Sequence, residues 1–188
     1  MEQINQKLNE LGSLREELIS GSSIWRLAKQ IKMRAKPLEI TASNDALSLE
    51  SAPGLYYFEA KFNFKDFNKL EEFGIKWGVI RKTKEPKGVS RYYPERAAHH
   101  TNRLQRNGFI PFYLGKREDI SDRIISHLDG TVESGTYSLK LRSRPEIING
   151  ITFRYSYVNF DINTNSYFGV ELLERELREV FNPIIGKQ

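Results

Sequence analysis

The sequence contains no cysteine among its 188 residues. This absence excludes a disulfide scaffold, a cysteine-based zinc site, an iron–sulfur cluster and a cysteine nucleophile. No apolar run approaches the roughly 18 residues that a membrane-spanning helix needs. The N-terminal residues also lack the basic region and apolar stretch that are typical of a signal peptide. We therefore expect a cytoplasmic protein without a membrane partner.

Histidine is scarce, and no loop has the pattern that binds nucleotide phosphates. His99 and His100 are adjacent, and without cysteine they give poor support for a zinc site. Gly115 and Lys116 lack the preceding glycine and the following Ser or Thr of a nucleotide-binding loop. No serine elbow is present either. The composition is otherwise that of an ordinary globular domain, with 39% hydrophobic and 28% charged residues.

Positive charge is concentrated in two zones of the chain. Residues 76–106 hold nine Lys or Arg and two acids, so this zone alone exceeds the net charge of +5 of the whole chain. Residues 26–36 hold five bases and no acid. Two such zones favour a polyanionic partner, although two solvated surfaces are an alternative interpretation.

Hydrophobic periodicity predicts helices near both ends of the chain and strands between them. Apolar side chains at three-to-four spacing predict a helix over residues 2–19, and a second helix begins after Gly21 and ends before Pro37. Further helices are predicted over 95–106, 119–128 and 168–181, and strands over 54–62, 109–115, 136–142 and 151–160. Pro111 indicates that its strand lies at a sheet edge or begins there. These elements favour an α+β fold, a small antiparallel sheet flanked by helices.

Several residues whose side chains could take part in catalysis occur on these elements in a regular order. Gly54-Leu55-Tyr56 lies on the first predicted strand, and Tyr113-Leu114-Gly115 ends the next. Arg123 and His127 are four residues apart and share one face of the following helix. Glu174 lies within the apolar stripe of the last helix. A carboxylate that faces inward needs a cation, and Mg²⁺ or Mn²⁺ suits a site with few protein oxygens.

This set of residues resembles the GIY-YIG endonuclease superfamily. The resemblance covers residues 54–60 and 109–183 and implies that the two tripeptides lie on neighbouring antiparallel strands. We accordingly expect an N-terminal helical extension over residues 1–50 and a nuclease-like domain over residues 51–188.

Two features depart from the family pattern. The tripeptides usually lie a short hairpin apart, whereas Tyr56 and Tyr113 are 57 positions apart. The gap holds most of the more basic zone, so we expect a basic insertion at about residues 64–108 between the first two core strands. Many family members also have an asparagine shortly after the proline that corresponds to Pro183, and here the nearest one, Asn182, precedes it.

The resemblance implies a role for each candidate residue. Tyr56 would help to deprotonate the attacking water, Tyr113 would lie beside the scissile phosphate, and Arg123 would neutralise its charge. His127 would assist Tyr56 or bind phosphate, and Glu174 would hold one Mg²⁺ or Mn²⁺ ion. Lys116 is a candidate phosphate contact, and the candidate DNA contacts in the insertion are Arg91, Arg96, Asn102, Arg103 and Arg106. Packing, salt bridges and solvated positions are the structural alternatives for these side chains.

The function expected from these residues is that of a metal-dependent DNA endonuclease. A compact core with a large insertion is typical of a restriction-type enzyme that reads double-stranded DNA. One active site cuts one strand, so a double-strand cut needs a homodimer or two successive nicks. The alternatives are a repair or structure-specific nuclease, a mobile-element nuclease, a non-catalytic nucleic-acid-binding module, and an enzyme that acts on RNA.

Overall fold

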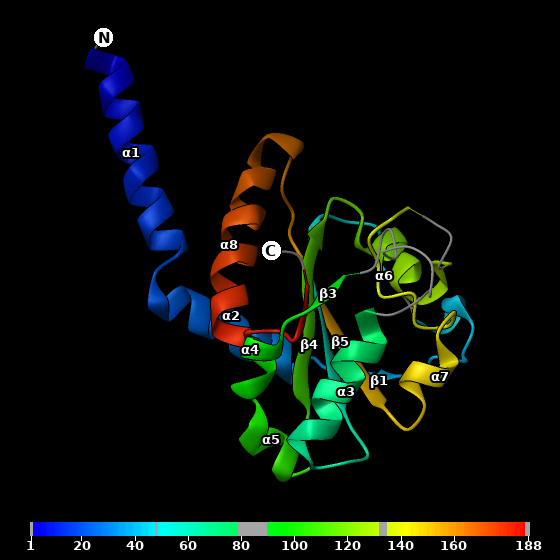
Figure 1. Ribbon diagram of the computed structural model, residues 1–188. Helices are drawn as coiled ribbons and strands as arrows, with labels where there is room; N and C mark the ends of the chain where they lie inside the picture. The colour runs from blue at the N-terminus through cyan, green and yellow to red at the C-terminus, as the bar shows by residue number, and fades with distance from the viewer. Residues whose placement is uncertain (1, 48, 79–89, 132–134, 187–188) are drawn as a thin grey trace.

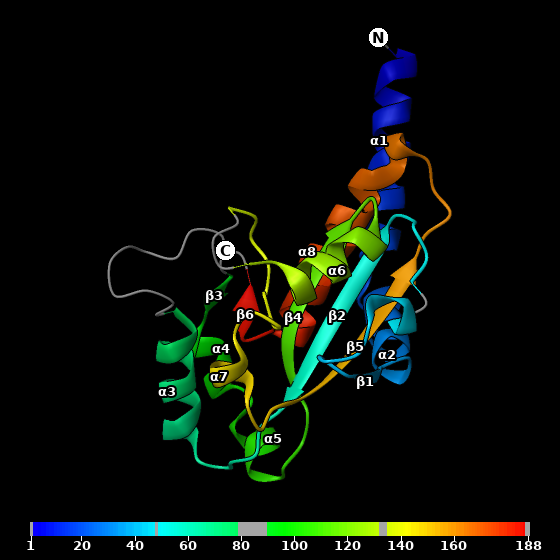
Figure 2. The same ribbon diagram turned by 90° about the vertical axis from the view of Figure 1, so that its right-hand side faces the viewer.

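An antiparallel sheet of four strands forms the centre of the protein, in the order β1-β5-β2-β4 (Figure 2). The computed structural model describes residues 2–47, 49–78, 90–131 and 135–186. The strands within these residues are β1 (Lys36–Leu38), β2 (Gly54–Lys61), β3 (Arg91–Tyr92), β4 (Ile110–Arg117), β5 (Thr152–Asn159) and β6 (Ile185–Gly186). The helices are α1 (Glu2–Leu18), α2 (Gly21–Met33), α3 (Phe67–Gly78), α4 (Pro94–Ala98), α5 (Thr101–Gln105), α6 (Ile120–Asp129), α7 (Pro145–Ile148) and α8 (Tyr167–Phe181), with 3-10 turns η1 (Asn44–Leu47) and η2 (Thr164–Ser166). The fold is α+β, as the sequence predicts.

Helices cover both faces of the sheet, and each face has its own hydrophobic core (Figure 1). Successive side chains of β2 point to opposite faces, as they must in an extended strand. Tyr56 and Phe58 therefore pack on the face that α3 and α6 cover. Leu55 and Tyr57 pack on the face that α2 and α8 cover. This alternation directs Tyr56 toward α6.

The two glycine-containing tripeptides lie opposite each other on paired strands. β2 and β4 run antiparallel, with Tyr56 opposite Gly115 and Gly54 opposite Arg117. Within the described sheet, β4 pairs with β2 alone and so lies at an edge, which agrees with the position of Pro111.

The helices on the two faces bury the stripes that the sequence predicts. α6 begins after Asp119, whose side chain accepts a hydrogen bond from the backbone N–H of Asp122 at 3.0 Å. Its apolar residues Ile120, Ile124 and Leu128 are fully buried. α8 buries four apolar side chains together with Glu174. The two helices thus present Arg123 and Glu174 from opposite sides of the sheet edge.

Most of the predicted insertion, residues 64–108, is part of the main core. α3 places Leu70, Phe73 and Trp77 against the sheet. The indole N–H of Trp77 donates to the backbone oxygen of Ser90 at 2.8 Å, and β3 pairs with the C-terminal β6. The insertion is therefore anchored at several points. Its residues 79–89, which hold four of the nine bases of the larger zone, lie outside the described residues.

The N-terminal part of the chain is divided between core and solvent. α2 packs Ile24, Ala28 and Ile31 against the sheet, and β1 pairs with β5. α1 buries none of its residues and projects away from the body (Figure 1). Only α1 therefore stands apart, whereas we expected a separate extension as far as residue 50. None of the helices described combines the length and the apolar character needed to cross a bilayer.

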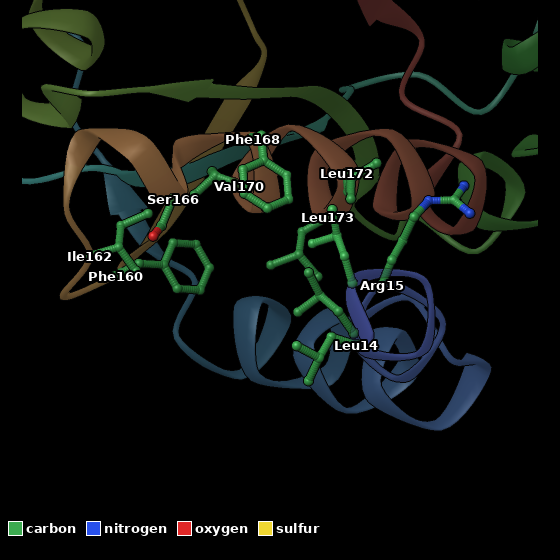
Figure 3. Close-up of a pocket in the computed structure, with 12 residues that line it drawn as sticks. Leu14, Arg15, Phe160, Ile162, Ser166, Phe168, Val170, Leu172 and Leu173 are labelled. Atoms are coloured by element: carbon green, nitrogen blue, oxygen red, sulfur yellow. The ribbon is translucent and has the colours of Figure 1, made fainter. Parts of the chain in front are cut away.

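An apolar groove of about 320 Å³ lies between α1 and α8. Figure 3 shows Leu14 of α1 beside Leu173 of α8, with Phe160 at the far side. The same apolar stripe of α1 continues beyond the groove, because Ile4 and Leu8 share this face at three-to-four spacing and are also exposed.

Two predicted elements differ in the structure. The helix expected over 95–106 is divided into α4 and α5 at His99 and His100, because the buried His100 ring turns to the backbone oxygen of Asn182 at 2.8 Å. The strand expected over 136–142 is not formed. Instead, the N–H of Leu139 donates to His127 Nδ1 at 2.9 Å, and that of Leu141 donates to the His127 carbonyl at 3.0 Å. The backbone of this segment is therefore hydrogen-bonded to the C-terminal end of α6 and is not a strand of the described sheet.

Candidate active site

A cleft of about 230 Å³ opens where β2, β4, α6 and α8 meet. The residues that line it are Tyr56, Tyr113, Gly115, Lys116, Arg117, Arg123, Tyr137, Glu174 and Arg178. Four of the five predicted catalytic residues are among them, although they come from four separate elements. The fold therefore brings together residues that lie far apart in the sequence.

Both glycines of the tripeptides are required by close packing. A Cβ atom at Gly115 would lie 2.5 Å from Tyr56 Cζ, so a side chain at this position would displace the Tyr56 ring. A Cβ at Gly54 would lie 2.5 Å from Ile120 Cδ1 and would also strike the backbone oxygen of Val158. Glycine at both positions lets the hydroxyl of Tyr56 cross β4 and lets α6 approach β2.

The two predicted tyrosines are neighbours on the same face of the sheet. The rings of Tyr56 and Tyr113 are stacked, with centroids 6.1 Å apart and planes inclined by 15°. The His127 ring lies against both, with its centroid 4.7 Å from that of Tyr113 and 5.2 Å from that of Tyr56. The stack holds both tyrosines at the cleft wall.

Arg123 and His127 both donate to the hydroxyl oxygen of Tyr56. Arg123 Nε lies 3.2 Å from this oxygen, and His127 Nε2 lies 3.1 Å from it. Because His127 Nδ1 accepts the backbone N–H of Leu139, the ring proton of neutral His127 is on Nε2. Tyr56 thus accepts two hydrogen bonds, and its own proton is directed elsewhere.

Burial determines the protonation of this group of side chains. It raises the pKa of Tyr56 well above its ordinary value, with a further contribution from Tyr113, while Arg123 acts in the opposite direction. Burial, followed by the charge of Arg123, lowers the pKa of His127 well below its ordinary value. At neutral pH Tyr56 is a phenol and His127 is uncharged.

The structure places His127 behind Tyr56 rather than in the cleft. Its side chain is fully buried and does not line the cavity. Of the two roles considered for it, assistance to Tyr56 fits this position, and direct contact with phosphate does not. His127 is a positioning residue.

Arg123 is held on two sides. Besides the bond to Tyr56, its Nη2 donates to the backbone carbonyl of Tyr137. No salt bridge to Asp119 forms; that carboxylate caps α6 instead. Sequence reasoning missed Tyr137 because a backbone carbonyl can come from any residue type.

α8 places Glu174 and Arg178 along the β4 side of the cleft, and Glu171 lies one turn before Glu174 on the same helix. Glu174 is 8% exposed, and its carboxylate accepts from Arg178 Nη2. Lys116 forms an ion pair with Glu171 and also lies 5.4 Å from the centroid of the Tyr167 ring. Arg178 was not among the predicted site residues, although its spacing of four from Glu174 was visible in the sequence.

The lining of the cleft is strongly cationic. Its charged residues are Lys116, Arg117, Arg123, Arg178 and a single carboxylate, Glu174. A concave surface with such an excess of positive charge attracts polyanions, because low-dielectric walls focus the field.

The candidate DNA contacts of the insertion lie apart from this cleft. Arg91, Arg96, Asn102, Arg103 and Arg106 do not line it. α5 precedes the start of β4 (Figure 1), whereas the residues of β4 that line the cleft are in its second half. The guanidinium of Arg96 covers the Tyr93 ring, with Cζ 4.1 Å from its centroid. Asn102 and Arg103 on α5 and Arg106 directly after it are exposed.

The residues present suit a divalent cation that keeps most of its water. Among the described residues, no group of three or more His, Cys, Asp or Glu side chains could hold a metal ion. Mg²⁺ is commonly bound through one or two carboxylates together with water and substrate phosphates. Glu174, a nearly buried carboxylate at the wall of a cationic cleft, fits such a site.

Comparisons of the chain with models of protein families, with curated proteins and with solved structures found no match. The functional argument therefore depends on the geometry of the cleft and on the resemblance of its residues to the GIY-YIG pattern.

Proposed function

We propose that the protein is a divalent-metal-dependent endonuclease that hydrolyses phosphodiester bonds in DNA. The observation that carries this proposal is the convergence of Tyr56, Arg123 and Glu174 in one cationic cleft, with Tyr56 bonded to Arg123 and His127. The same residue types, in the same order along the chain, define the GIY-YIG pattern.

The chemistry follows from what each side chain can donate or accept. Arg123 places its guanidinium at the phosphate and offsets the charge that develops on the oxygens in the transition state. Tyr56 is a phenol in the free protein, so it would take the proton of the attacking water only after losing its own proton, a loss that nearby cations favour and that hydrogen bonds from Arg123 and His127 stabilise. Glu174 would hold a Mg²⁺ or Mn²⁺ ion, which would supply Lewis-acid stabilisation of the charge that develops at the phosphate. Tyr113 and Lys116 border the phosphate.

The substrate that we propose is double-stranded DNA cut at a specific sequence, as a restriction-type enzyme does. The supporting feature is the exposed polar surface of Asn102 and Arg103 on α5 and of Arg106 directly after it, which offers side chains of the types that read base edges. Each chain contains one cleft of this kind among its described residues. A double-strand cut therefore requires a homodimer or two successive nicks, and we propose the homodimer as the active form.

The test is digestion of plasmid and phage DNA with Mg²⁺ or Mn²⁺ by the wild type, Glu174→Ala and Arg123→Ala. Discrete fragments that both variants fail to produce are the expected result. Nicking or smearing that is lost in the variants would retain the nuclease but replace restriction by repair or mobile-element functions. Cleavage of RNA alone would change the substrate class. Cleavage that both variants retain, or none at all, would overturn the proposal and favour a binding module.

A further inference from the structure

The carboxylate that would hold the metal is already engaged by a cation. Arg178 Nη2 donates to Glu174 Oε1, and both side chains line the cleft. Their side chains are 17% and 10% exposed, respectively, so water screens this pair only weakly. Glu171, Glu174 and Arg178 follow one another along the face of α8 that adjoins β4, at spacings of three and four residues.

A metal ion and Arg178 compete for Glu174. The oxygen that accepts the guanidinium hydrogen bond is an oxygen that a metal would need, and the guanidinium charge repels a second cation close to it. Glu174 is the carboxylate that Arg178 pairs with among the described residues lining the cleft, so a displacement of Arg178 would break this partly buried ion pair. Its displacement in the free protein is therefore unfavourable.

A substrate phosphate supplies an acceptor that can replace Glu174 as the partner of Arg178. Guanidinium groups bind phosphate oxygens in pairs, and a phosphate in this cleft lies beside Arg178 as well as Arg123. When Arg178 turns to phosphate, Glu174 becomes available to the metal, and the phosphate itself provides further oxygen ligands.

We propose that Arg178 is a latch that couples metal binding to substrate binding. It occupies Glu174 in the free protein and transfers to a backbone phosphate when DNA enters the cleft. The inference rests on the proposed function and adds a regulatory and substrate-binding residue to the same site. Its consequence is that the free protein binds metal weakly, which limits metal-dependent cleavage to the complex with DNA.

The chain offers a matched control for this role. Arg175 lies on the same helix and pairs with Glu176, but it is 58% exposed and does not line the cleft. Arg178→Gln and Arg175→Gln therefore remove the same charge from the same helix, and only the first releases Glu174.

The experiment measures Mn²⁺ binding by calorimetry without DNA, and duplex DNA binding by fluorescence anisotropy without metal. Arg178→Gln is expected to bind Mn²⁺ about tenfold more tightly than wild type and DNA about tenfold more weakly, roughly the factor that one charge-assisted hydrogen bond contributes. Arg175→Gln is expected to match wild type in both. Arg178→Lys retains the charge but cannot pair with two phosphate oxygens, so its DNA affinity falls while its Mn²⁺ affinity stays near that of wild type.

Glu174→Gln separates failure of the latch from failure of the proposed function. If Glu174→Gln abolishes Mn²⁺ binding but Arg178→Gln leaves it unchanged or weaker, the latch is overturned and the metal site stands. If Arg178→Gln binds Mn²⁺ more tightly than wild type and the double variant of Glu174→Gln and Arg178→Gln retains this gain, the proposed metal site itself fails. Circular dichroism of each variant identifies any loss of fold. If Arg178→Gln does not fold, Arg178→Lys tests the latch instead, and a DNA affinity equal to that of wild type would overturn it.

Discussion

Gly115 determines where the hydroxyl of Tyr56 lies. No other residue fits beside the Tyr56 ring, because a Cβ here would approach Tyr56 Cζ to 2.5 Å. Gly115→Ala is expected to lower the free energy of unfolding by about 1–3 kcal/mol, as overpacking of a core does. It should also reduce DNA cleavage, since the hydrogen bonds from Arg123 and His127 depend on the ring position.

Gly12 on α1 is the control for this substitution. A Cβ at Gly12 meets no atom within 4 Å, so Gly12→Ala should raise the stability of α1 by up to about 1 kcal/mol through helix propensity. Urea unfolding measures both variants. A Gly115→Ala protein as stable and as active as wild type would contradict the close approach of Tyr56 to β4.

His127 makes stability depend on pH. Its folded-state pKa is lowered by burial and by Arg123, while Tyr56 and Tyr113 are the other titratable groups that it contacts. The unfolded chain therefore binds a proton below about pH 6.5 that the folded chain does not. Neutral His127 makes its full contribution to the free energy of unfolding above about pH 6.5. Below that pH the contribution declines by up to about 1.4 kcal/mol per pH unit.

The variant His127→Gln retains a donor for Tyr56 but does not titrate. The free energy of unfolding, measured in urea at pH 7.5, 6.5 and 5.5, should fall less steeply for the variant than for wild type. Some slope should remain, because burial also lowers the pKa of His100. Equal slopes in the two proteins would mean that His127 is not buried as a neutral ring.

At the scale of elements, the start of α6 orients Arg123. The Asp119 carboxylate caps the helix and also accepts from Ser51, and these two hydrogen bonds are the main causes of its lowered pKa. Asp119→Ala should lower the free energy of unfolding by about 1 kcal/mol, the usual effect of removing such a cap. Thermal unfolding checks this value, and Asp119→Asn, which still caps, should recover most of it. A loss shared equally by both variants would contradict the capping role.

Helix periodicity predicted more of the site than strand alternation did. The inward position of Glu174 and the common face of Arg123 and His127 follow from the spacing of apolar residues, and the structure shows both. The sequence of residues 136–142 alternates like a strand, with apolar side chains at Tyr137, Leu139 and Leu141, but in the structure Ser138 and Lys140 are buried as well. The backbone N–H groups of Leu139 and Leu141 bond to the end of α6, and this tertiary preference is not visible in a local pattern.

At the scale of the whole molecule, Lys32 of one basic zone lies within electrostatic range of Arg103 of the other. Burial, followed by the charge of Arg103, lowers the pKa of Lys32, so α5 of one zone lies close to α2 of the other. This surface lies toward the start of β4 (Figure 1), whereas the residues of β4 that line the cleft are in its second half. Sequence reasoning identified both zones but not their proximity, because it depends on how α2 and the insertion pack around the sheet.

The central claim is that Glu174 in this cleft supports hydrolysis of DNA. The most direct measurement compares cleavage of supercoiled plasmid by wild type, Glu174→Gln and Glu176→Gln in Mg²⁺. Glu176 lies on the same helix, outside the cleft, in an ion pair with Arg175. We predict that Glu174→Gln reduces the rate by at least about a hundredfold and that Glu176→Gln stays within about twofold of wild type. Equal activity of the two variants, or none in the wild type, would contradict the account.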